Sequence, residues 1–381
     1  MMDRSLQSRA YFVSTCLPHK KKYRFTWMIE EISEKSDLAS ARLQLAPAML
    51  ATLKEGITPV AINPRECTLE EMINIESSDA KFYLFGKIAT GFENIEEVCL
   101  KCINLAINAN RNKIKVLTTY CDSWCDYTES IDNDSGPTER TRNKAISSLY
   151  KNLMYLSDYA IYPCKSQQES AKKWTKQKCT SNIIIDPLQY KQQPFLKINA
   201  GEEIRLIWIG HYSNFIFLEK ALKMMMTECN TLSPFKLDIL TRAPKGLIDL
   251  SWAQKILTKT IWTVAVHKWS NEKAKLYLKN AHISLLPSDI NCARKSASSH
   301  SRAIDSINSG CLTIASPIRS YVELSECLIL GYDFAKMLDD IVERYNEVSE
   351  EVKSTRKIVL GRFSSEVNAK NWSTLIRGAS R

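Results

Sequence analysis

The sequence predicts an α/β protein made of two doubly wound domains in tandem, followed by a largely helical tail. Short apolar runs rich in β-branched residues alternate with amphipathic segments along most of the 381 residues. The alternation stops at the polar, proline-bearing stretch 190–203 and then begins again. Hydrophobic residues make up 44% and charged residues 25% of the chain, which is typical of a folded globular protein.

In the first half, short apolar runs bounded by turn residues predict strands at 10–15, 57–62, 81–86, 113–121, 158–164 and 182–187. Apolar residues at a helical period predict helices at 38–56, 95–110, 145–157 and 166–174. Gly56 is the expected stop of the first of these helices. Buried strands that alternate with helices favour a parallel sheet covered on both faces.

The second half repeats this pattern. Strands are expected at 204–210, 235–241, 262–269, 282–287 and 311–316, and helices at 214–229, 271–281, 301–310 and through most of 334–376. The expected domains are therefore 1–190 and 204–360, joined by the linker 191–203. We expect the helix in 361–381 to pack back on the first domain. Ligands of such sheets bind beyond the carboxyl ends of the strands.

The formal net charge of +10 favours anionic partners, namely nucleotide phosphates, an acidic membrane surface or nucleic acid. An ordinary solvated surface is the alternative. No basic stripe is interleaved with aromatic residues, so nucleic acid is not the expected partner. No apolar run approaches the roughly 18 residues that span a bilayer. Twelve cysteines without an export signal indicate reduced thiols and a cytoplasmic location.

The stretch SHSRAIDSINSGCLTIASP, 299–317, predicts a short helix that ends before a buried strand. A helix amino terminus suits a diphosphate, because its unpaired N–H groups point at the ligand. Ser301 and Arg302 lie at that end, and an arginine can bind phosphate bidentately. Lys295 precedes them as a further cation. Alternatively, Arg302 and Asp305 form an exposed ion pair that contributes less than about 1 kcal/mol.

Four segments of the second half carry a resemblance to a known family: IRLIWIGHYSNFIFLEKAL, VHKWSNEKAKLYLKNAHISLLPSD, KSASSHSRAIDSINSGCLTIASPIRSYVEL and FSSEVNAKNW. In this order they resemble the donor domain of GT-B glycosyltransferases, in particular the bacterial family-4-like group (glycosyl transferases group 1). The first half resembles that family more loosely, through SARLQLAPAMLATLKEG, VLTTYCDSWCDY, LSDYAIYPCKSQQESAKKW and NIIIDP.

The resemblance implies two Rossmann-like domains that face a cleft. It also implies transfer of a sugar from a nucleotide-diphosphate sugar to an acceptor hydroxyl, with retention of configuration and without a metal or other cofactor. Asp305 matches the family's acidic residue five positions before a glycine, which contacts the nucleotide ribose. The family often has a second acid eight positions earlier, where this chain has Ala297.

The family's Arg and Lys pair after the first donor strand is also absent. GHYSN, 210–214, takes its place, so we expect His211, Ser213 and Asn214 to contact the donor phosphates or sugar. Alternatively, Ser213 and Asn214 only cap the helix that follows. Tyr321, after the Ala-Ser-Pro strand end, is a further candidate for the donor site.

Acceptor residues are expected in strand-end loops of the first domain. His19 could act as a catalytic base, with Asp122 as a second catalytic candidate. Lys20 and Lys21 could bind an anionic lipid-linked acceptor or a membrane surface. In the loop that contains Asp122, the ring of Trp124 could stack on a sugar while the carboxylate of Asp126 binds hydroxyls. A solvated or merely structural loop is the alternative for both segments.

Cys99 and Cys102, with Cys121 and Cys125, loosely imitate a zinc site. The first pair lies in the middle of a predicted helix, where cysteine serves as a small apolar residue, so no metal site is expected.

The sequence thus favours a glycosyltransferase of surface polysaccharide or glycoconjugate synthesis. Its expected partners are a nucleotide sugar and a glycan or lipid-linked acceptor, and its expected place is the cytoplasm, peripheral at the inner face of the membrane. The alternatives are a non-catalytic GT-B-like partner subunit that binds nucleotide sugar or glycan, and an inverting enzyme that uses His19 as its base.

Overall fold

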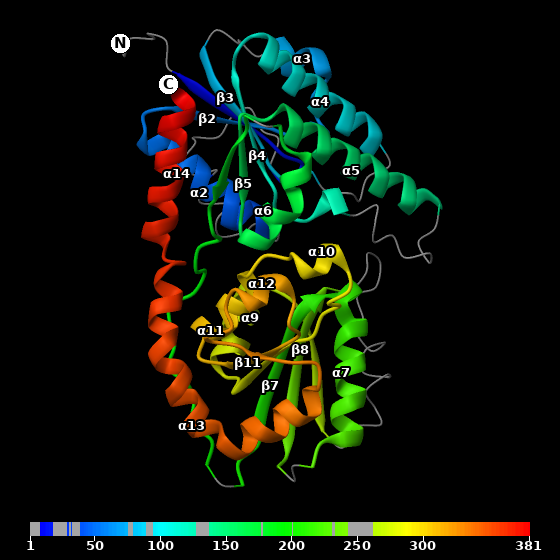
Figure 1. Ribbon diagram of the computed structural model, residues 1–381, viewed down its shortest axis with the longest axis vertical. Helices are drawn as coiled ribbons and strands as arrows, with labels where there is room; N and C mark the ends of the chain where they lie inside the picture. The colour runs from blue at the N-terminus through cyan, green and yellow to red at the C-terminus, as the bar shows by residue number, and fades with distance from the viewer. Residues whose placement is uncertain are drawn as a thin grey trace. The chain divides into compact units, whose positions relative to one another are not determined.

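The computed structural model describes residues 8–17, 29, 32, 39–74, 79–88, 94–126, 137–176, 178–199, 201–230, 233–242 and 262–381. The chain forms two compact units. Unit 1 holds Met1–Pro187, Ala297–Ser299 and Ser365–Arg381, and unit 2 holds Leu188–Ser296 and His300–Ser364. Each unit contains a six-stranded parallel sheet between helices (Figure 1). This confirms the predicted class of two doubly wound α/β units with C-terminal helices.

The sheet of unit 1 has the strand order β2-β1-β3-β4-β5-β6. Its strands are β1 (Arg9–Val13), β2 (Thr58–Ile62), β3 (Ala80–Phe85), β4 (Lys115–Thr119), β5 (Tyr159–Tyr162) and β6 (Thr180–Ile183). The helical segments are η1 (Ala41–Leu45), α2 (Ala46–Lys54), α3 (Leu69–Asn74), α4 (Ile95–Arg111), η3 (Trp124–Asp126), α5 (Pro137–Leu156), α6 (Lys165–Ala171), η4 (Lys172–Trp174) and α14 (Ser365–Ser380). All six predicted strands of this half are present.

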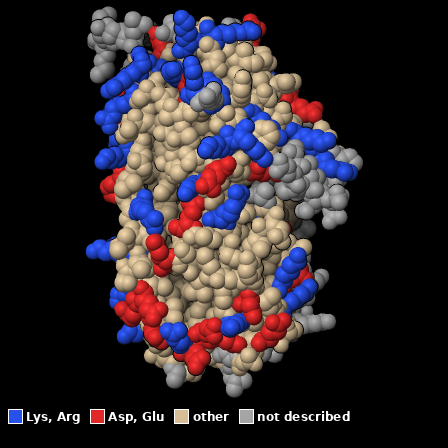
Figure 2. All heavy atoms as spheres, in the orientation of Figure 1, with Lys and Arg blue, Asp and Glu red and all other residues tan. Residues whose placement is uncertain are grey.

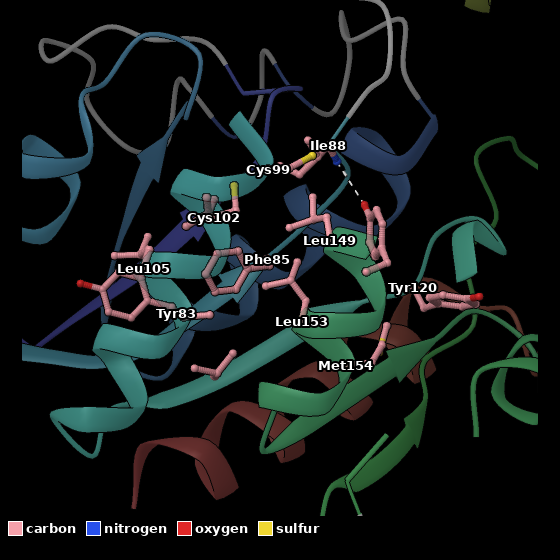
Figure 3. Close-up of a cluster of buried hydrophobic side chains, with 14 of the residues drawn as sticks. Tyr83, Phe85, Ile88, Cys99, Cys102, Leu105, Tyr120, Leu149, Leu153 and Met154 are labelled. Carbon is pink, nitrogen blue, oxygen red and sulfur yellow. Dashed lines mark hydrogen bonds between the residues drawn. The ribbon is translucent and has the colours of Figure 1, made fainter. Parts of the chain in front are cut away.

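Helices cover both faces of this sheet. On one face, α4 and α5 pack on alternate side chains of the strands, among them Tyr83 and Phe85 (Figures 1 and 3). Cys99 and Cys102 of α4 lie in this core, and burial, with a smaller effect of Glu96, raises the pKa of the Cys99 thiol to about 12. On the other face, α2 packs with α14, whose Trp372 is 1% exposed.

The sheet of unit 2 has the strand order β12-β11-β10-β7-β8-β9. Its strands are β7 (Ile204–His211), β8 (Phe235–Arg242), β9 (Thr263–Lys268), β10 (Ile283–Leu286), β11 (Leu312–Ala315) and β12 (Ile329–Leu330). The helical segments are η5 (Tyr212–Asn214), α7 (Phe215–Glu228), α9 (Asn271–Lys279), α10 (Ala293–Ser296), α11 (Ser301–Asn308), α12 (Arg319–Val322) and α13 (Phe334–Gly361). The two-residue strand β12 was not predicted, because so short a run carries no periodicity.

Side chains of β7 alternate between the two faces of this sheet. Trp208 lies in a core with α7 and α13, whereas Ile207 lies in a second core with α9. Helix α11 packs on the α9 face as well, since its Ser306 hydroxyl lies 2.8 Å from that of Ser284 on β10. The first turn of α11 therefore lies at the carboxyl edge of the sheet, on the same face as α9.

In the described part of the chain, no helix is both long enough and apolar enough to cross a membrane. Lys and Arg side chains predominate over unit 1 in the view of Figure 2, whereas unit 2 shows both signs of charge.

His282, next to the start of β10, makes unit 2 sensitive to acid. Its Nδ1 accepts the backbone N–H of Arg205 at 2.9 Å, and its Nε2 lies 3.3 Å from the Arg205 guanidinium. Burial, reinforced by this positive charge, lowers the pKa of His282 from 6.5 to about 4.

A base whose pKa is lowered by folding binds a proton more readily in the unfolded chain. We therefore expect the contribution of His282 to the free energy of unfolding to be constant above pH 6.5 and to fall between pH 6.5 and 4. The loss should be at most about 3 kcal/mol. Urea denaturation at a series of pH values would measure it. His282→Gln should flatten this part of the profile, and an unchanged slope in that variant would contradict the assignment.

Candidate functional site

The topology of unit 2 marks one position where a ligand can bind. The strand order reverses between β7 and β10, so the chain leaves these two neighbouring strands toward opposite faces of the sheet. In open α/β sheets the crevice for a ligand lies at this point, outside the carboxyl ends of the strands. Here it is bordered by 210–214, at and after the end of β7, and by 287–300, after β10.

The structure brings together predicted residues from both of these segments. The Lys295 ammonium donates a hydrogen bond to Oδ1 of Asn214, and it also lies 5.9 Å from the ring of Phe217. In the segment after β7, the Nδ1 atom of His211 lies 2.9 Å from the Ser213 hydroxyl, and both residues are exposed. His211 and Ser213 thus present polar atoms to solvent beside a fixed cation.

Helix α11 carries the other predicted donor residues. Ser301 and Arg302 are half-buried in its first turn, at the carboxyl edge of the sheet. One turn later, the Oδ2 atom of Asp305 accepts a hydrogen bond of 2.6 Å from the Gln189 side chain. Asp305 is therefore held by a residue of the segment between β6 and β7, while the first turn of α11 adds N–H donors and a guanidinium.

His300 is a residue that the sequence did not single out. It directly precedes α11, is only 4% exposed, and packs edge-on against the ring of Phe363. Its Nε2 atom lies 3.3 Å from a Glu323 carboxylate oxygen, but among the described residues neither ring nitrogen makes a hydrogen bond of good geometry. A single histidine in a serine-rich stretch gives no periodic signal, so this position emerged only from the fold.

Tyr321, the last predicted donor residue, lies elsewhere than expected. It is fully buried in α12, and its hydroxyl has no hydrogen-bond partner in the part of the chain that the structure describes. The loop interpretation failed locally because residues 319–322 form a helical turn whose aromatic side chain packs inward.

Unit 1 has a corresponding position between β1 and β3, where its own strand order reverses. The Lys87 ammonium, just after β3, forms an ion pair of 2.6 Å with Asp122, just after β4. The backbone around Lys87 is fixed from two sides. Its carbonyl accepts a hydrogen bond of 2.5 Å from the Ser14 hydroxyl, and the amide of Ile88 donates to Tyr150 at 3.1 Å (Figure 3).

Lys87 remains charged at neutral pH. Burial acts to lower its pKa, but the Asp122 carboxylate outweighs that effect, and the pKa lies above the usual range. Asp122, a predicted catalytic residue, keeps 43% of its side chain exposed, against 23% for Lys87. The pair thus faces solvent at the carboxyl edge of the sheet. A lysine that directly follows a strand-ending glycine was the sequence signal that could have identified it.

The other predicted acceptor residues lie deeper or outside the described part of the chain. Trp124 is 6% exposed, and its ring stacks on that of Tyr150. Asp126 is 4% exposed, accepts a hydrogen bond from Ser170 and lies 4.0 Å from the Lys173 ammonium. His19, Lys20 and Lys21 fall outside the described residues.

The two edges therefore offer different chemistry. The edge of unit 2 combines a helix amino terminus, a guanidinium and a fixed ammonium, which can bind and stabilise negative charge. The edge of unit 1 offers an exposed carboxylate held by a lysine, which can accept a hydrogen bond from a hydroxyl group.

No protein-family model matches this chain, and no curated protein matches it. Solved structures match it along nearly the whole length. HepE of Anabaena, in complex with UDP and glucose, gives a TM-score of 0.63 at 9% identity, covering 97% of this chain and 100% of that chain. Sucrose-phosphate synthase from Thermosynechococcus elongatus gives 0.60 at 11% identity, covering 97% and 98%. The lipopolysaccharide outer core galactosyltransferase WaaB in its apo form gives 0.52 at 12% identity, covering 97% and 99%.

At such low identity the similarity concerns the fold. It extends over both units, and each of them has the parallel, doubly wound sheet described above. The chain therefore has the GT-B fold of glycosyltransferases.

Proposed function

We propose that this chain is a glycosyltransferase that moves a sugar from a nucleoside-diphosphate sugar to an acceptor hydroxyl. The observation that carries the proposal is the convergence at the edge of unit 2. Lys295 of α10 and Asn214 of η5 meet at the strand-order reversal, and α11 presents Arg302 at the same edge. HepE, which shares the fold, has been crystallised with UDP and with UDP-glucose.

In this proposal the cations of unit 2 stabilise the diphosphate as it leaves. The charge on the departing oxygen grows in the transition state, so donors already held in place favour that state over the ground state. Lys295 acts as a fixed point charge, and Arg302 acts together with the first turn of α11. The carboxylate of Asp305 would accept hydrogen bonds from the ribose hydroxyls.

The acceptor hydroxyl would bind at the edge of unit 1, beside Lys87 and Asp122. We further propose a retaining reaction that needs no metal, and a role in the synthesis of a surface polysaccharide or glycoconjugate at the cytoplasmic face of a membrane. WaaB, a lipopolysaccharide galactosyltransferase of the same fold, is consistent with that setting. Separating the anomers of the product by NMR would test the stereochemistry.

A thermal-shift experiment tests nucleotide binding. A ligand that binds only the folded state stabilises it by about 2.7 kcal/mol at a hundredfold excess over Kd. We expect at least one of UDP, GDP, ADP and CMP to raise the unfolding temperature at millimolar concentration, and Asp305→Ala to abolish that rise.

Gln189→Ala is the matched control, because it removes the hydrogen bond between these two side chains but leaves the carboxylate in place. It should keep the nucleotide shift. If both variants lose the shift equally, the hydrogen bond between Gln189 and Asp305 is structural and Asp305 is no ribose ligand. If no nucleotide shifts the wild-type protein, the proposed function fails.

A further inference from the structure

The face of α5 that points away from the core of unit 1 carries a row of positive charge. Arg140, Lys144 and Lys151 follow one another at four and seven residues, which puts them on one face of a helix, opposite Leu149 and Leu153 of the core. None of the three forms an ion pair with a residue that the structure describes. From Arg140 to Lys151 the row is about 17 Å long.

The short helix η4 widens this row. The Lys151 ammonium lies 4.1 Å from the centre of the Trp174 ring, and the Lys173 ammonium lies 5.1 Å from the same ring. Lys172 and Lys173 are both exposed. The half-buried Trp174 thus fixes two ammonium groups beside each other. We define the cationic surface by these side chains, namely Arg140, Lys144, Lys151, Lys172 and Lys173.

The like charges of the cationic surface repel one another. Arg140 and Lys144 have the spacing of four residues at which equal charges destabilise a helix. Lys173 lies 4.0 Å from the carboxylate of Asp126, but Asp126 is only 4% exposed and compensates only part of the charge. An anion bound across the cationic surface would therefore remove an existing repulsion and be attracted by a field of one sign.

The cationic surface lies beside the segment that contains Asp122. The Ser147 hydroxyl of α5 donates to the Cys125 carbonyl at 3.4 Å, and the Lys173 ammonium lies 4.0 Å from Asp126. Cys125 and Asp126 belong to η3, which follows Asp122 in the segment after β4. A ligand that extends along α5 would therefore pass next to the edge at which the acceptor hydroxyl is proposed to bind.

The arrangement of the charges favours a polymer as the ligand. The cations are spread along a helix and do not converge on one point, so a single small anion cannot contact all of them. Among the described residues of α5, α6 and η4, Tyr155 is the only large apolar side chain that is exposed, whereas stable binding to a bilayer requires buried apolar area as well as positive charge. Two ammonium groups lie close to the Trp174 ring, so this ring is no free platform for nucleic-acid bases.

We infer that the cationic surface binds an anionic glycan, and that the acceptor is a glycan chain with negative groups along its length. The inference rests on the proposed function, because it takes the edge beside Asp122 as the acceptor site. The cations would form charge-assisted hydrogen bonds with the negative groups of the chain while its end reaches Asp122. Several weak contacts made at once would raise the local concentration of chain ends at that edge.

Titration of the full chain with polygalacturonate, a glycan with a carboxylate on every sugar unit, tests this inference. Polygalacturonate should bind at low ionic strength and be released by added salt, which screens exposed charges. Dextran, a neutral glycan, should not bind. Arg140→Gln combined with Lys144→Gln should weaken polygalacturonate by about tenfold, since each exposed ion pair contributes a factor of up to about five. Circular dichroism would establish that the variant is folded.

Lys275→Gln combined with Lys279→Gln is the matched control. These two lysines are exposed on α9 with the same spacing of four residues, so their loss removes the same charge from unit 2. The control should bind polygalacturonate like the wild type. Equal losses in the two double variants, or binding of dextran as tight as that of polygalacturonate, would overturn the inference. Tighter binding of phosphatidylglycerol vesicles or of duplex DNA would overturn it as well, in favour of that partner.

Nucleotide titration of the same preparation separates this inference from the proposed function. If a nucleoside diphosphate binds and polygalacturonate does not, the anionic glycan is overturned while the proposed function stands. If polygalacturonate binds and no nucleotide does, the proposed function fails, and with it the role of the bound glycan as an acceptor.

Discussion

Replacing Gly310 by alanine is expected to destabilise unit 2 by about 3 kcal/mol or more, at the upper end of single-substitution effects. Gly310 has a φ of 82°, in the left-handed region where a side chain is strained by about 1–2 kcal/mol. A Cβ at this position would also overlap the carbonyl group of Pro194, with the carbonyl carbon only 2.8 Å away. Since both partners are backbone, neither can move aside without shifting a segment.

The segment that would shift is the one that holds α11. The Gln193 amide donates to the Asn308 carbonyl at 2.9 Å, and the Asn308 side chain donates to the Tyr190 carbonyl at 2.6 Å. Pushing this stretch of chain away would break these hydrogen bonds and disturb the helix that is proposed to bind the diphosphate. We therefore expect Gly310→Ala to weaken nucleotide binding as well as stability.

Gly201→Ala is the control for backbone strain alone. Gly201 has a similar φ of 78°, but a Cβ added there would meet no atom within 4 Å. This variant should lose only about 1 kcal/mol, the strain of a left-handed residue. Urea denaturation followed by circular dichroism would compare the two. Equal losses for both variants would show that the contact with Pro194 relaxes freely, contrary to the prediction.

Replacing Lys87 by methionine is expected to lower the rate of sugar transfer by about a hundredfold, the size of effect typical of a misplaced reacting group. The ammonium lies 2.6 Å from Asp122 and orients the carboxylate that would contact the acceptor hydroxyl. Without that ammonium, the Asp122 carboxylate loses its ion-pair partner and is free to rotate. Nucleotide affinity should not change, because the residues proposed to bind the donor belong to unit 2.

The comparison variant is Lys115→Met. Lys115 also forms an ion pair with an aspartate, since its ammonium lies 3.7 Å from Asp158. However, Lys115 is the first residue of β4, so it lies at the opposite end of that strand from Asp122. It should keep both transfer and nucleotide binding. Steady-state kinetics with a nucleotide sugar, together with calorimetric nucleotide titration, would separate the two effects. Wild-type turnover in the Lys87 variant would rule out a role of the pair in transfer.

Much of the fold was readable in the sequence because it depends on local patterns. Apolar runs such as 81–86 and 113–121 are strands buried on both faces, and their composition alone indicates it. The helix stop at Gly310 was readable for the same reason, since only glycine adopts its backbone conformation without strain. The prediction was wrong where the segment was too short to show a period, as at Tyr321. This residue was expected in a loop but lies in a four-residue helix that buries its side chain.

The residue types at the carboxyl edge of unit 2 could also be read from the sequence, because a family resemblance and the preference of anions for helix amino termini both pointed to 295–305. The sequence by itself determined two parallel α/β units and the segments that end at their carboxyl edges. Only the tertiary structure decided which side chains meet there. Lys87 and Asp122 are 35 residues apart, and Arg242 ends β8 whereas Trp269 follows β9. Such pairings depend on strand order and register, which come from packing between distant segments and leave no periodic trace along the chain.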